Sequence, residues 1–172
     1  MRKFAKSSAL LVLATVLCCP LAAFSESCYS VGGKVKMVNL SDGITQSGTV
    51  KIDLTNSSGD ETFISKGQLV GTITGPGPEY GTTLLSHTAI LKDGSSFITN
   101  GDKAYITGVR ALNADGLACS FYVQEYLTDI TQGTGFFENV ESVDILADGY
   151  ISICLPDENE NKFVLSGVCC LN

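Results

Sequence analysis

The chain contains one histidine, His87, and therefore at most one site that depends on an imidazole. Apolar residues alternate with polar ones over 84–92, and His87 falls on the apolar face. Glu125 falls on the apolar face of the segment 117–128 in the same way. A histidine and a glutamate that point into one interior form a candidate acid–base pair with shifted pKa values. The alternatives are a hydrogen-bonded core pair, or a one-residue bulge that turns both side chains toward solvent.

Two aromatic side chains are candidate ligand contacts beside this pair. Phe121 shares the face of Glu125, and Tyr105 belongs to a neighbouring apolar segment, although rings on strands also serve ordinary packing. The chain has no Gly-x-Ser-x-Gly motif, no Gly-x-Gly-x-x-Gly motif and no Walker-type loop. These features favour ligand binding without catalysis, and they leave the question of an enzyme open.

The segments that carry these residues alternate with a period of two, which is typical of half-buried strands. No segment shows helical periodicity. The predicted strands cover 33–40, 49–54, 68–74, 84–92, 96–99 with 103–110, 117–128, 140–147 with 150–155, and 163–170.

Pairs of turn residues separate these strands. Asp-Gly and Asn-Gly pairs favour the tight turns of antiparallel hairpins. About eight strands without a helical connection predict an all-β domain, and we expect a single antiparallel barrel because closure removes exposed edges. The pairs are Asp42-Gly43, Asp93-Gly94, Asn100-Gly101, Asp115-Gly116 and Asp148-Gly149.

Five cysteines lie within this domain: Cys28, Cys119, Cys154, Cys169 and Cys170. A closed barrel brings its first and last strands together, so Cys28 is expected to pair with Cys169 or Cys170, and Cys119 with Cys154. An odd number leaves one thiol unpaired, and sequence alone does not choose among the pairings. The absence of a Cys-x-x-Cys motif and the single histidine predict no metal site, and no cofactor is expected.

The N-terminal segment 1–25 has the pattern of a secretory signal peptide. It has a positively charged start, an apolar run over 9–19 and small residues before a cleavage site after Ser25, with cleavage after Ala23 as the alternative. The apolar run is shorter than the ~20 residues that a membrane helix needs. The sequence therefore predicts a secreted or periplasmic domain over 26–172, with disulfides and no membrane span after cleavage.

The domain is acidic. From residue 26 onward, 8 Lys and Arg stand against 18 Asp and Glu, which changes the formal net charge from −7 for the whole chain to 8 − 18 = −10. No run of basic residues is present, which argues against nucleic acid and anionic lipid as partners.

The stretch Gly133-Thr134-Gly135-Phe136 resembles the Gly-Thr-Gly-x-Phe motif of the dirigent and allene-oxide-cyclase barrel superfamily, as do its late position and the strand count. We expect the glycines to bend the backbone, so that Phe136 or Phe137 plugs one end of the barrel. The resemblance implies a cavity for a hydrophobic small molecule and a homo-oligomer, often a trimer. It carries over no catalytic residue.

The leading hypothesis is an exported barrel that binds a small apolar ligand in its interior. One alternative is a cyclase- or isomerase-type enzyme that uses His87 and Glu125. The other is a structural or adhesive surface protein whose partner is another protein.

Overall fold

The structure, a computed structural model, describes residues 27–154 and 159–172, and most of them lie in antiparallel strands. The predicted signal peptide lies outside these residues. No helix in the described segments is long and apolar enough to cross a membrane. The elements are β1 (Ser27–Asn39), β2 (Thr45–Asn56), β3 (Thr62–Pro76), β4 (Thr82–Leu91), β5 (Ser96–Thr99), β6 (Asp102–Leu112), β7 (Ala118–Leu127), β8 (Ile130–Thr134), the 3₁₀ turn η1 (Gly135–Phe137), β9 (Val140–Ser152) and β10 (Glu160–Leu171).

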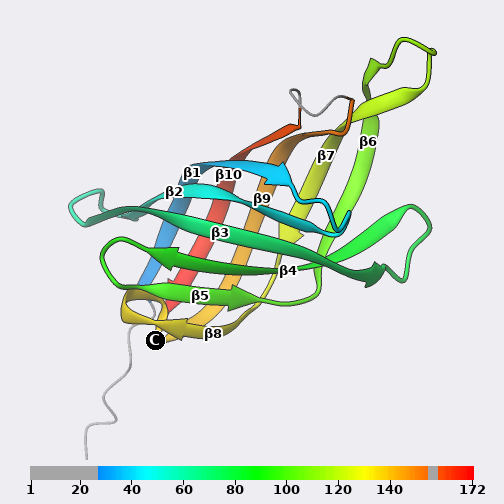
Figure 1. The fold of residues 1–172 in the computed structure, drawn as a ribbon. Helices are drawn as coiled ribbons and strands as arrows, with labels where there is room; N and C mark the ends of the chain where they lie inside the picture. Colours follow the sequence, from blue (N-terminus) through cyan, green and yellow to red (C-terminus); the bar gives the residue numbers. More distant parts are fainter. Residues whose placement is uncertain (1–26, 155–158) are drawn as a thin grey trace, which may run out of the picture.

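Eight of the strands close into a barrel. The hydrogen-bonded ring runs β1, β2, β3, β4, β6, β7, β9, β10 and back to β1, whereas β5 pairs with β4 and β8 and extends the sheet at one end (Figure 1). This arrangement confirms the predicted single antiparallel barrel.

Alternation along the strands decides which side chains enter the barrel. In β2, Val50, Ile52 and Leu54 are buried, whereas Lys51 and Asp53 lie on the outer face. The other strands contribute in the same way to one apolar core. Burial of this surface drives closure, since each fully buried aliphatic side chain contributes about 1.5–3 kcal/mol.

Four of the five turn pairs lie between strands as predicted. The pair Asp148-Gly149 does not, because β9 runs through it without a break and the predicted division into 140–147 and 150–155 is wrong. Gly149 lies opposite Phe163 in β10. A Cβ at Gly149 would lie 1.9 Å from the Lys162 carbonyl oxygen, so the glycine permits close strand contact instead of a turn.

Both expected disulfides are present. Cys28 faces Cys170 across β1 and β10 and is bonded to it, and Cys119 is bonded to Cys154. Among the cysteines of the described segments, Cys169 is the one without a disulfide, and it points into the barrel with 1% of its surface exposed. Burial raises the pKa of Cys169 to about 11, so the thiol stays protonated and unreactive.

The glycine-rich stretch closes one end of the barrel. Gly135 has a φ of +60°, which starts the 3₁₀ turn and directs Phe137 into the core. Phe136 stacks on Phe63 with a distance of 4.3 Å between ring centroids. The prediction that these phenylalanines plug a barrel end is confirmed.

Candidate functional site

Three ionisable side chains meet inside the barrel, one from each of three adjacent strands. His87 comes from β4, Asp102 begins β6, and Glu125 lies in β7. The inward directions predicted for His87 and Glu125 are correct, since each is about 5–6% exposed. Asp102 is 1% exposed and directly follows the bend at Asn100-Gly101.

The imidazole of His87 holds the cluster together. Its Nδ1 lies 2.9 Å from Asp102 Oδ2 and 3.3 Å from Glu125 Oε1. The hydroxyl of Thr99 donates a hydrogen bond to the same Asp102 oxygen and accepts one from the backbone N–H of His87 at 3.1 Å. Asp102 and Thr99 therefore fix the orientation of the ring.

The pKa values of His87 and Glu125 are both raised, for different reasons. Burial by itself lowers the pKa of His87, but the negative charge of Glu125 and the hydrogen bond and charge of Asp102 overcome this effect and raise the pKa above 6.5. Burial raises the pKa of Glu125 above 4.5, and the charge of Asp102 adds to this effect while that of His87 opposes it. The cluster therefore favours His87 and Glu125 in their protonated forms.

Two carboxylate oxygens in the cluster lack a hydrogen bond within the described structure. These atoms are Asp102 Oδ1 and Glu125 Oε1. His87 Nδ1 forms its hydrogen bond with the nearer carboxylate, Asp102, at 2.9 Å, and Glu125 Oε1, 3.3 Å from the same nitrogen, has no hydrogen bond to a described residue. A buried oxygen without a donor costs about 1–3 kcal/mol. A proton on Glu125 or an external donor relieves this cost.

Three small cavities lie one after another along the interior of the barrel. One of about 40 Å³ is lined by His87 and Glu125 together with apolar side chains. It shares Gln46, Glu125 and Phe163 with a second cavity of about 100 Å³ at the end of the barrel opposite η1. Glu125 is therefore the ionisable group where the two cavities meet, and Gln46 is the other polar side chain there.

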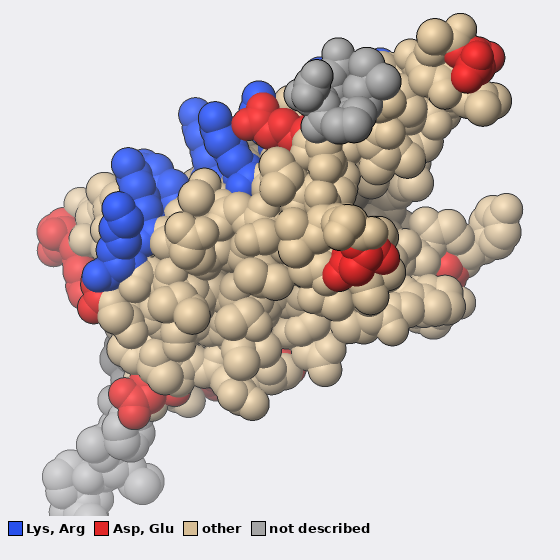
Figure 2. Space-filling model, in the orientation of Figure 1, with Lys and Arg blue, Asp and Glu red and all other residues tan. Residues whose placement is uncertain are grey.

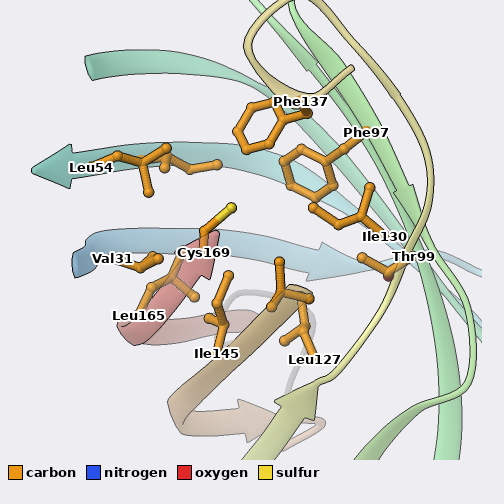
Figure 3. Close-up of a pocket in the computed structure, with 12 residues that line it drawn as sticks. Val31, Leu54, Phe97, Thr99, Leu127, Ile130, Phe137, Ile145, Leu165 and Cys169 are labelled. Carbon is orange, nitrogen blue, oxygen red and sulfur yellow. The ribbon is translucent and has the colours of Figure 1, made fainter. Parts of the chain in front are cut away.

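A third cavity, of about 40 Å³, lies toward η1. Figure 3 shows Phe97, Phe137, Leu54 and Cys169 around it. Its lining presents no polar surface, and cavities of this kind stay dry. Each of these three spaces is far smaller than the ~300–1,000 Å³ of common ligand pockets, so the barrel interior is largely filled by side chains.

The other predicted ligand residues lie in different surroundings. Tyr105 lines the 100 Å³ cavity together with Glu125, so these two are brought together. Phe121 packs against the core and lines neither cavity that contains Glu125. Sequence reasoning missed Asp102, because an aspartate after Asn-Gly has the pattern of an exposed turn.

The arrangement is able to bind a donor group and to exchange a proton. Asp102 positions His87, whose Nε2 makes no hydrogen bond to a described residue and lies against Gly71, where a Cβ would be 2.8 Å away. The predicted acid–base pair of His87 and Glu125 is thus in contact, and its use in catalysis stays a prediction.

No protein-family model, curated protein or solved structure shows significant similarity to this chain.

Proposed function

We propose that the barrel binds a small amine whose positively charged head contacts Glu125 and whose apolar body occupies the cavity at the open end. The observation that carries this proposal is the pair of buried carboxylate oxygens without a donor, one of which lies where two cavities meet. The proposed ligand keeps the apolar body that the sequence led us to expect and adds a positively charged head.

The charge of the cluster favours a cation. Two carboxylates face one imidazole, so the fully ionised cluster has a net charge of −1 even with His87 protonated. The raised pKa of Glu125 lets a proton neutralise that charge. An ammonium group would take the place of this proton and supply donors to the same oxygen. Amine binding should therefore release a proton and strengthen as the pH rises through the pKa of Glu125.

The cavity limits the size of the ligand and the character of its body. The space of about 100 Å³ is lined by apolar side chains that include Leu85, Ile106 and Val123, and Tyr105 stands beside them. A short alkyl or benzyl group suits this lining. We place the binding in an oxidising compartment outside the cytoplasm, in accord with the two disulfides and the signal-like N-terminal segment.

Isothermal titration calorimetry with matched ligands tests the proposal. Butylamine and benzylamine should bind, whereas butyrate, butanol and toluene, which lack the cation, should not. The Glu125→Gln variant should lose at least about tenfold in affinity, since a charge-assisted hydrogen bond contributes about 1.5–3 kcal/mol. Glu141→Gln, a change at an exposed carboxylate, is the matched control and should bind as the wild type does.

Three results would contradict the proposal. They are the absence of amine binding by the wild type, equal binding by Glu125→Gln, and equal binding of the neutral or anionic ligands. Repeating the titration in buffers with different ionisation enthalpies measures the released proton. An affinity that does not change with pH would also count against the exchange at Glu125.

A divalent metal ion is a second candidate occupant. The ligand atoms of His87, Asp102 and Glu125 lie within 4.8 Å of one another, and the shorter separations of 2.9 and 3.3 Å suit atoms bound about 2.1 Å from one ion. We rank the metal ion second because a metal-bound histidine usually donates its other N–H to an acceptor, and His87 Nε2 has no such acceptor among the described residues. Titration with MnCl₂ and ZnCl₂, and elemental analysis of the purified protein, distinguish it from the amine.

A further inference from the structure

Positive charge gathers in one groove on the outside of this acidic barrel. Five of the eight basic residues that follow residue 26 line a groove of about 600 Å³ across β1, β2, β3 and the turn after β4. Figure 2 shows the blue side chains grouped over β1 and β2, while most of this face carries no basic group. The five are Lys34, Lys36, Lys51, Lys66 and Lys92.

Strand register arranges four of these lysines in a row. Lys34 lies opposite Lys51, and Lys51 lies opposite Lys66. The backbone N–H of Lys92 donates to the carbonyl of Lys66 at 2.8 Å, which places Lys92 beside it. Neighbouring strands are about 4.8 Å apart, so the row extends about 14 Å across the sheet.

The row has a cost in stability that its own acidic neighbours do not remove. Like charges directly opposite each other on adjacent strands destabilise a sheet. Lys51 pairs with Asp53 at 2.6 Å. Lys34, Lys66 and Lys92 have no ion-pair partner within residues 27–154 and 159–172. An anionic ligand would supply the missing charge.

We infer that this groove binds a linear acidic polysaccharide, whose carboxylate or sulfate groups lie along the lysine row. A row of cations suits a chain with repeated charges, whereas a single anion needs cations that converge. Thr49 and Gln68 offer hydrogen bonds to sugar hydroxyls, and Ile90, which is 62% exposed, offers an apolar surface to a sugar ring.

Other polyanions suit the groove less well. Single-stranded nucleic acid binds through aromatic side chains on which bases stack, and none of the groove residues is aromatic. A bilayer presents a broad surface, whereas these lysines line a hollow. The polysaccharide is therefore the occupant that both the charge and the lining favour.

Binding of size-defined octasaccharides tests the inference by titration calorimetry. Octasaccharides of heparin and of polygalacturonate should bind the wild-type protein, and maltooctaose, which is neutral, should not. The double variant Lys66→Gln/Lys92→Gln should bind about tenfold more weakly, since two exposed ion pairs are lost. Its binding should also depend less steeply on salt concentration.

The matched control removes two positive charges elsewhere. Lys103 and Arg110 are exposed or half-exposed, and neither lines the groove. The variant Lys103→Gln/Arg110→Gln should bind within about twofold of the wild type, because at moderate salt charges beyond about 10 Å are screened. Circular dichroism of both variants checks that the barrel stays folded.

Several outcomes would overturn the inference. Failure of the wild type to bind both acidic octasaccharides is one, and an equal loss of affinity in the two double variants is another. Tighter binding to an eight-nucleotide DNA strand or to vesicles of anionic lipid than to the octasaccharides would assign the groove to a different partner. All of these results are independent of amine binding at Glu125, which lies inside the barrel.

Discussion

The two disulfides should contribute unequally to stability, in the order of the loops that they close. Cys28 and Cys170 are 142 residues apart, and Cys119 and Cys154 are 35 apart. In the chain-entropy model these loops correspond to about 5 and about 4 kcal/mol, because the entropy removed from the unfolded chain grows with the logarithm of loop length. The first value is comparable with the whole stability of many domains, which is about 5–15 kcal/mol.

Urea unfolding of alanine double variants measures this difference. We expect Cys28→Ala/Cys170→Ala to lose about 1 kcal/mol more than Cys119→Ala/Cys154→Ala. Tyrosine fluorescence and far-ultraviolet circular dichroism can report the transition, since the chain has no tryptophan. Cys169→Ala is the control, because it removes a buried thiol without opening a loop.

The reasoning would be refuted in either of two ways. One is a larger loss for the shorter loop at unchanged m-values. The other is a loss for Cys169→Ala as large as that for Cys28→Ala/Cys170→Ala, which would assign the effect to packing.

Three further predictions concern the cluster and the lysine row. Gly71→Ala would place a Cβ 2.8 Å from Nε2 and 2.9 Å from Cδ2 of His87, so the ring must shift from its present position. We expect the free energy of unfolding to fall by about 1–3 kcal/mol and the imidazole pKa to change, read from the single histidine signal by NMR. His87 and Glu125 both bind protons more tightly in the folded protein, so the free energy of unfolding should decrease as the pH rises from 4.5 through their raised pKa values. Urea titrations at a series of pH values measure this decrease, and Glu125→Gln should remove its acidic part. Lys66→Gln should raise the free energy of unfolding by up to about 0.5 kcal/mol, because it relieves the repulsion between neighbouring lysines of the row. Lys103→Gln loses the 3.6 Å ion pair with Glu79 and should not raise the free energy of unfolding in the same titration.

Much of the candidate site could be predicted from alternation alone. A strand places every second side chain on the same face, so apolar neighbours were enough to direct His87 and Glu125 inward. The prediction from turn preference was wrong at Asp148-Gly149, because this pair lies in the middle of β9. Turn propensity is local, and the close contact between β9 and β10 outweighs it.

Asp102 shows what the local pattern could not reveal. Its neighbours Asn100 and Gly101 indicate an exposed turn, and they do form a bend. The chain then turns back into the barrel at once, and the pairing of β4 with β6 brings Asp102 beside His87. Burial of this carboxylate depends on contacts between segments that are separate in sequence.

The sequence by its own chemistry was sufficient for most strands, their inward faces and most turns, because each depends on periodicity or local turn preference. For the cysteines it narrowed the partners of Cys28 to Cys169 and Cys170, because a closed barrel brings the chain ends together, but it did not choose between them. The tertiary structure alone decided the rest. Barrel closure and side-chain packing limited the interior cavities to small volumes, and the register of four strands placed separate lysines in one row. Register and packing arise from many weak contacts between distant segments, so no local pattern encodes them.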